Sequence, residues 1–272
     1  MNPGRWIFLA LTAATLVRGE EPATAPVIKV AGLAVVWENI DADEADPYKP
    51  FGLEAGTRLS LIFQLPAKRI VSFDHGESSV ESMVDDKGTN LLALSHRLQV
   101  PGYLGHACGI VKEGQCAHVE VFGGTAPTTG ATMVQTRGKA VFFTGSRSEK
   151  IATTPVKGEN GAEIRAGEVC KLSLARWEPG GIGGKGANVT LRLEFHPALI
   201  AGVNFIDAEG KQIESRPAGM AVEGEGDKRV FLLHYHLASM PENLAMEIEY
   251  WSDLERVKVP FEVKAGLGGG DP

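Results

Sequence analysis

Hydrophobic and polar residues alternate along many short stretches of the chain, and no long stretch has a helical period. In Val189–Phe195 the odd positions are apolar and the even positions polar, and Val257–Val263 repeats this alternation around Pro260. A period of two places one face of a strand in the core and the other in water. The pattern predicts an all-β protein, with Pro260 on an edge strand or at a bulge because proline cannot donate a ladder hydrogen bond.

One order of landmarks occurs in both halves of the chain. Each half has a Trp-Glu pair, an alternating strand that ends in Phe, an Asp-x-x-Gly turn and a later apolar strand. The landmarks are Trp37-Glu38, Leu59–Phe63, Asp85–Leu91 and Val119–Phe122 in the first half, and Trp177-Glu178, Leu191–Phe195, Asp207–Ile213 and Ile248–Trp251 in the second. In both turns we expect Asp to cap the backbone and Gly to take a positive φ. The repetition predicts two tandem immunoglobulin-like β-sandwich units that arose by internal duplication; two such units without duplication are the alternative.

Changes in composition along the chain predict the boundaries of these units. The mostly apolar Trp6–Val17 follows an arginine-bearing start, which is typical of a secretory signal peptide and too short for a transmembrane helix. A polar, turn-rich segment separates the two landmark series. We therefore expect a signal peptide over 1–25, a first sandwich over 26–145, a linker over 146–161, a second sandwich over 162–266 and a disordered tail over 267–272. The mature chain is expected to be secreted or periplasmic, without a transmembrane anchor.

The charge of the chain limits which classes of partner are expected. The net charge is −7, and the 27 basic residues are interleaved with 34 acidic ones. No basic stripe with interleaved aromatic residues occurs, so nucleic acid is not an expected partner.

The three cysteines raise the question of a disulfide, which export permits. Cys108 and Cys116 flank a short segment that is typical of a hairpin turn. If the turn centres on Lys112, the two thiols lie opposite each other and form a bridge; the alternative is two small buried thiols. Cys170 lies in an alternating stretch and is expected to be buried and free.

Two groups of residues suggest metal ligands. His234 and His236 are two positions apart on a predicted strand and share a face, where His196 from a neighbouring strand would complete a transition-metal site. Asp41 and Asp43 belong to an acidic loop of the kind that holds a structural calcium ion. The alternatives are hydrogen-bonded histidines on a sheet face and a solvated acidic loop. No other cofactor is expected.

The chain carries no motif that predicts catalysis. Asp74, His75 and Ser78 are adjacent, but adjacency in sequence does not make a triad. A nucleophile elbow, a phosphate loop and a zinc-protease motif are all absent from the sequence. No catalytic residue is predicted. Aromatic side chains that stack on sugar rings are a further possibility, and Trp37, Trp177, Tyr250 and Trp251 are the candidates. For Trp37 and Trp177 we favour the alternative, a core position of the kind that β-sandwiches give to tryptophan.

The last quarter of the chain carries a family resemblance. Phe205–Arg216, Tyr250-Trp251 and the closing Val257–Leu267 together resemble uncharacterised exported β-sandwich proteins of environmental bacteria, and Phe51–Leu92 resembles them more loosely. The resemblance implies fold and export, and no activity.

These observations lead to one expected function and two alternatives. We expect an exported, non-catalytic binding or structural protein whose partner is an extracellular or periplasmic protein or glycan. Its ligand would bind at loops of one sandwich end or in the cleft between the units. A metal-binding or calcium-stabilised secreted protein is the first alternative, and a secreted hydrolase or its accessory module is the second.

Overall fold

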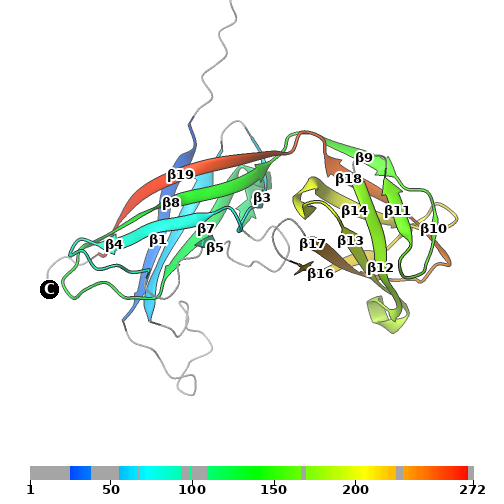
Figure 1. The fold of residues 1–272 in the computed structure, drawn as a ribbon, viewed down its shortest axis with the longest axis horizontal. Helices are drawn as coiled ribbons and strands as arrows, with labels where there is room; N and C mark the ends of the chain where they lie inside the picture. The colour runs from blue at the N-terminus through cyan, green and yellow to red at the C-terminus, as the bar shows by residue number, and fades with distance from the viewer. Residues whose placement is uncertain are drawn as a thin grey trace, which may run out of the picture.

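The structure is a computed structural model that describes residues 25–37, 55–65, 68–92, 98–99, 109–166, 170–224 and 229–268. These residues form four antiparallel sheets joined by turns and short 3-10 segments, so the prediction of an all-β protein is confirmed. The sheets gather in two units, and Figure 1 shows β8 and β19 side by side in the first unit, with one end of each at the junction with the second. Residues 1–24 of the predicted signal peptide, Asp41, Asp43 and Cys108 lie outside the described residues.

The first unit consists of two sheets that enclose one core. Its strands are β1 (Val27–Val36), β2 (Gly56–Gln64), β3 (Ile70–Phe73), β4 (Ser79–Asp85), β5 (Leu98–Gln99), β6 (Ile110–Val111), β7 (Cys116–Gly123), β8 (Met133–Thr144) and β19 (Glu255–Gly266). One sheet has the order β1-β2-β7-β5 with β6 on β7, and the other has the order β19-β8-β3 with β4 also on β8. Phe63 of β2 meets Phe142 of β8 and Phe261 of β19 at centroid distances of 5.2 Å and 5.8 Å. Aromatic contacts at this range tie the two sheets together.

The second unit also consists of two sheets around one core. Its strands are β9 (Ser148–Ala152), β10 (Val156–Lys157), β11 (Glu163–Ala166), β12 (Cys170–Gly180), β13 (Gly186–Leu193), β14 (Ile200–Ile206), β15 (Gln212–Ile213), β16 (Ser215–Glu223), β17 (Val230–Leu237) and β18 (Asn243–Trp251). The sheet orders are β11-β12-β13-β17-β16 and β10-β18-β14-β15, with β9 on β18. Trp177, Leu191, Phe205 and Met246 are buried in this core. The 3-10 turn η4 (Pro197–Leu199) leads into β14.

The path of the chain between the units corrects the expected boundaries. The segment 146–161, expected to be a linker, contains β9 and β10, which pair with β18 of the second unit. The closing strand β19, expected in the second sandwich, pairs with β8 along its whole length, and Val259 and Phe261 enter the core of the first unit. The second unit is therefore inserted between β8 and β19. Pro260 lies on the edge strand of its sheet, as its missing donor predicts.

The two Asp-x-x-Gly turns have the same hydrogen bonds, which confirms their predicted role. The Asp85 amide donates to the Thr89 carbonyl at 3.1 Å, and the Asp207 amide donates to the Lys211 carbonyl at 3.0 Å. Each Asp side chain also accepts from the amides two and four positions later. Gly88 and Gly210 have φ angles of 89° and 79°. The Asp-x-x-Gly landmark therefore has the same turn geometry in both halves of the chain.

The other landmarks agree less well with each other. Trp177 is 8% exposed in the core, whereas Trp37 is 55% exposed. Val119–Phe122 lies on β7, beside β2, while Ile248–Trp251 lies on β18 in the sheet opposite β13. The two copies of the fourth landmark therefore lie on strands that do not occupy the same position in their units.

Acid should destabilise the first unit through Asp85. Burial would raise the pKa of this carboxyl, but hydrogen bonds from the amides of Thr128, Thr89 and Lys87 outweigh it and lower the pKa from 3.8 to about 2. A carboxyl with a depressed folded pKa stabilises the fold above its unfolded pKa, and this contribution is lost as the pH falls from about 5 toward 2. We expect the midpoint of thermal unfolding to fall over this range, and to fall less in Asp85→Asn, as followed by circular dichroism. An Asp85→Asn profile as steep as the parent's would contradict the assignment.

Candidate binding cleft

A cleft of about 840 Å³ opens along one side of the second unit and ends against the first. Its walls come from β14, from β16 and β17, and from the turn between β3 and β4. We call it the β14 cleft. The residues that define it are Ile200–Asn204, Met220, Val222, Arg229, Phe231, Leu233, Tyr235 and, from the first unit, Asp74–Gly76. Figure 1 shows β14 and the β16–β17 pair on the side of the second unit that faces the first.

The floor of the β14 cleft is an apolar sheet face that is incompletely covered. Phe231, Leu233 and Tyr235 alternate along β17 and therefore point to one side. On β16, Met220 and Val222 lie opposite Leu233 and Phe231 in register. The β17 side chains are only partly buried, and Val222 is 48% exposed. In the first unit, by contrast, the inward side chains of β2 at positions 59, 61 and 63 are all 0% exposed.

The wall opposite this floor is an open strand edge. On one side β14 pairs with β18 from Ile200 to Ile206. On the other side β15 pairs only with Phe205 and Ile206, and the chain then crosses at Glu214 to the other sheet, where Ser215 pairs with Leu237. Consecutive residues Ile200–Asn204 line the cleft, as expected when a strand presents its edge. Among the described residues no strand pairs with this part of the edge.

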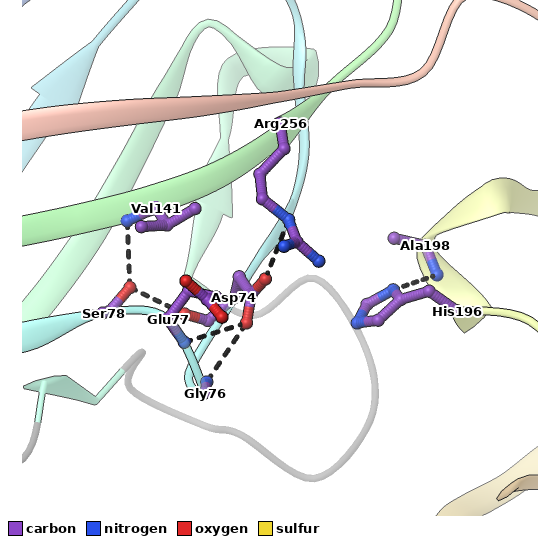
Figure 2. A network of polar contacts seen from close by, with 8 residues as sticks. All are labelled: Asp74, Gly76, Glu77, Ser78, Val141, His196, Ala198 and Arg256. Carbon is purple, nitrogen blue, oxygen red and sulfur yellow. Dashed lines mark hydrogen bonds and ion pairs between the residues drawn. The ribbon is translucent and has the colours of Figure 1, made fainter. Parts of the chain in front are cut away.

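An ion pair fixes the end of the cleft that belongs to the first unit. The Asp74 Oδ2 atom lies 3.2 Å from Arg256 Nε, and the Asp74 side chain is 9% exposed. The other carboxylate oxygen accepts from the amides of Gly76 at 3.1 Å and Glu77 at 3.2 Å. Figure 2 shows Arg256 reaching Asp74 from β19, with the His196 ring facing them from the second unit. The Asp74 charge is therefore neutralised within the protein.

His196 connects the two units at the same place. Its Nδ1 atom accepts from the Ala198 amide at 3.2 Å, which caps η4 (Figure 2). Its ring lies 4.3 Å from that of Phe143 and 5.2 Å from that of Phe231. Burial lowers the pKa of His196 below its usual 6.5; Asp74 opposes this shift, and the cations of Arg256 and Arg229 add to it. The side chain is thus uncharged at neutral pH and acts here as a packed ring.

Arg229 supplies positive charge at this end of the cleft. It lines both the β14 cleft and a smaller cavity of about 260 Å³ between the units. A Cβ atom placed on Gly76 would lie 3.2 Å from its Nη1 atom, so the guanidinium lies close to that turn. Arg229 makes no ion pair within the part of the chain that the structure describes. The guanidinium therefore places a positive charge at this end of the cleft.

The predicted metal ligands are hydrogen-bonded to neighbours on β13. His234 Nδ1 lies 3.0 Å from the Thr190 hydroxyl, and His236 Nδ1 lies 2.7 Å from Asn188 Oδ1. Both rings point to the face of β17 opposite the cleft floor. His196, expected as their third ligand, lies instead at the junction of the units. Within the described ranges no three His, Cys, Asp or Glu side chains form a metal-binding group.

The hairpin that precedes Cys116 centres just after Glu113, whereas the disulfide prediction requires a turn centred on Lys112. The turn η2 (Lys112–Gly114) connects β6 to β7, and Val111 lies opposite Cys116. Cys116 is 3% exposed, and its Sγ atom accepts from Gln64 Nε2 at 3.3 Å. The position that the disulfide prediction gave to Cys108 is therefore occupied by Val111. Cys170 is buried in the second core, and burial raises the pKa of its thiol.

The aromatic candidates for glycan stacking have separate roles. The Tyr250 hydroxyl donates to Glu149 at 3.0 Å. The Trp251 ring lies under the Arg69 guanidinium at 5.4 Å and against Gly145. Trp37 is exposed directly after β1, a strand of the first unit that does not line the β14 cleft. The four candidates do not form a common surface, since Tyr250 and Trp251 lie on β18, Trp177 lies in the second core and Trp37 follows β1 of the first unit.

Asp74, His75 and Ser78 make local contacts in the turn between β3 and β4. The Ser78 hydroxyl donates to the Asp74 carbonyl at 2.6 Å and accepts from the Val141 amide at 2.9 Å (Figure 2). His75 packs its ring on Phe73 at 4.7 Å. This arrangement positions the turn that closes the cleft.

Comparison of the chain with protein-family models, curated proteins and solved structures finds no match. No helix in the described part is long and apolar enough to cross a bilayer.

Proposed function

We propose that the chain is an exported, non-catalytic binding protein and that the β14 cleft is its ligand site. The observation that carries this proposal is the partly exposed apolar floor of Phe231, Leu233 and Tyr235 beside an open strand edge. Leaving such side chains in water costs free energy, and a ligand that covers them recovers it. A volume of about 840 Å³ lies in the range of ligand sites. Export is proposed from the Trp6–Val17 pattern alone.

The chemistry of the cleft supports binding rather than turnover. Its polar groups near the first unit are already paired, because Asp74 binds Arg256 and His196 caps η4. Tyr235 lies in the floor, and burial raises the pKa of its hydroxyl to about 12, so it stays protonated. A site with an apolar floor and the Arg229 guanidinium at its end selects a ligand with an apolar body and an anionic group.

We also propose that the two units are immunoglobulin-like copies of one sandwich. The order β1-β2-β7 corresponds to β12-β13-β17, and each unit has the same Asp turn after β4 or β14. The strand β19 pairs with β8 in the first unit, as β9 pairs with β18 in the second. These correspondences support an internal duplication. They also support a later change in connection: the strand beside β8 comes from the C-terminal end of its unit, whereas the strand beside β18 comes from the N-terminal end of its unit.

The dye 1-anilinonaphthalene-8-sulfonate, which has an apolar body and a sulfonate, tests the proposed site. We expect calorimetry to show saturable binding of one dye per chain, because the floor and Arg229 offer both contacts it needs. Val203→Trp, which fills the cleft, should weaken binding at least about 10-fold.

A matched control is Ala221→Trp. Ala221 is exposed, lies opposite Leu232 in register and points to the other face of β16. This variant should bind the dye as the parent does. Equal binding by both tryptophan variants would place the dye elsewhere and remove the support for the cleft.

A further inference from the structure

We propose that the free edge of β14 binds an extended polypeptide segment as an added antiparallel strand, with the C-terminal carboxylate of that segment at Arg229. This inference rests on the proposed function and names the class of ligand. It follows from the open edge of β14 at Ile200–Asn204, the shape of the floor, and the position of Arg229 at one end of the cleft.

The backbone of Val203 points out of the sheet at the open edge. In an antiparallel pair, the N–H and C=O groups of one residue point to the same neighbour, and those of the next residue point away. The turn bond from Asp207 to Lys211 makes that pair hydrogen-bonded, so the Phe205–Ile213 pair is hydrogen-bonded as well. Val203 is two positions before Phe205, so its N–H and C=O point to the same side, beyond the end of β15. Both groups are therefore free to pair with an incoming strand.

An added strand would continue the line of β15. The chain leaves this line after Ile213, because Glu214 crosses to the other sheet. The free edge from Ile200 to Asn204 spans about 17 Å at roughly 3.4 Å per residue. A strand about 4.8 Å from β14 would lie over the floor at the usual sheet separation of about 10 Å. One extended segment of about five residues thus completes the short sheet and covers Phe231, Leu233 and Tyr235.

The alternation of the added strand determines its composition. A residue directly opposite Val203 points to the same side as Val203, which packs against the core of the second unit. Every second side chain of the ligand therefore meets the apolar floor, and the others meet solvent. The expected ligand alternates apolar and polar residues, as in strand-addition complexes.

The charge at one end of the cleft selects the orientation. The Ile200 end of β14 follows His196, whose ring contacts Phe231, and Arg229 is two residues before Phe231. An antiparallel segment runs toward this end, so its C-terminus arrives at Arg229. Asp74 does not compete for this cation, because its carboxylate is paired with Arg256. A free carboxylate at this point gains a charge-assisted contact.

The probe is the peptide acetyl-Ser-Val-Thr-Leu-Ser-Val with a free C-terminus, titrated calorimetrically into the full chain. We expect binding that competes with 1-anilinonaphthalene-8-sulfonate. The C-terminal amide of the same peptide should bind about 10-fold more weakly, since it lacks the charge. A peptide N-methylated at alternate residues keeps its side chains but cannot form the ladder, and should bind at least about 30-fold more weakly.

Two variants test the same contacts from the side of the protein. Val203→Pro removes the edge N–H and leaves the pairing with β18, so it should weaken peptide binding about 10-fold with little change in the midpoint of thermal unfolding. Arg229→Gln should weaken binding of the free acid about 10-fold and leave binding of the amide unchanged. The peptide modifications need no variant, so the test holds even if Val203→Pro folds poorly.

Each remaining outcome overturns a defined part of the inference. Equal binding of the N-methylated peptide would show recognition of side chains without strand addition. Dye binding without peptide binding would refute the inference and leave the proposed function standing, and the absence of both would refute both. A dimer in concentrated solution that Val203→Pro dissociates would identify a second copy of the chain as the occupant and would refute a separate partner.

Discussion

Replacing Phe261 with alanine is expected to lower the free energy of unfolding of the first unit by about 3–5 kcal/mol. Phe261 is 3% exposed, and its ring lies 5.8 Å from that of Phe63 at an interplanar angle of 78°. A Cβ atom on Gly138 would lie 2.8 Å from the Phe261 ring, so the ring packs directly on the β8 backbone. Neighbouring side chains cannot move into the space that truncation leaves, because β8 and β19 are fixed by continuous pairing.

Urea unfolding followed by circular dichroism measures this effect. Lys258→Ala is the matched control, because Lys258 is on the exposed face of the same strand and should change stability by no more than about 0.5 kcal/mol. A loss below about 1 kcal/mol for Phe261→Ala would mean that β19 does not complete the core of the first unit.

Replacing residues 145–254 with Asn-Gly should leave a first unit that still folds. Thr144 and Glu255 are paired, so β8 and β19 form a hairpin that the second unit interrupts. An Asn-Gly pair forms the two-residue turn that such hairpins prefer. The deletion removes the contact between Phe143 and His196 but none of the buried residues of the first core. We expect a cooperative thermal transition by circular dichroism, and the same loss of stability when Phe261→Ala is added.

The second unit is expected to fold alone for the same reason. Its ends lie together, because Ser148 pairs with Trp251 and the Ser252 amide donates to the Arg147 carbonyl at 3.0 Å. Asp253 Oδ1 also accepts from the amides of Ser146 at 2.9 Å and Arg147 at 3.0 Å. A fragment of residues 146–254 should therefore show its own cooperative transition. Two fragments that both remain unfolded would show that the units depend on each other.

The alternation of the sequence predicted strands and faces but not their partners. Val257–Val263 shows clearly which side of its strand is buried, and Pro260 correctly indicates an edge. Neither feature shows that this strand pairs with β8, more than a hundred positions earlier, because any apolar sheet face accepts an alternating strand. The boundary at 146–161 was wrong for the same reason, since short polar strands such as β9 are similar to linkers in composition.

The sequence pattern could not predict the β14 cleft. Phe231, Leu233 and Tyr235 alternate as fully buried core residues do. Their partial exposure comes from the shortness of β15 and from the crossing of the chain at Glu214, which are properties of sheet pairing. The Asp turns were predictable because their chemistry is local, and each Asp side chain caps its own turn. The cleft between units was an expected place for a ligand, but none of the floor residues Phe231, Leu233 and Tyr235 was identified.

The most direct test of strand addition at β14 is amide hydrogen exchange resolved by residue. In the free protein we expect the Val203 amide to exchange fast and the Phe205 amide, which pairs with Ile213, to exchange slowly. Saturation with acetyl-Ser-Val-Thr-Leu-Ser-Val should slow exchange at Val203 at least about 10-fold and leave the Ala221 amide unchanged. Unchanged exchange at Val203 under saturating peptide would contradict the account.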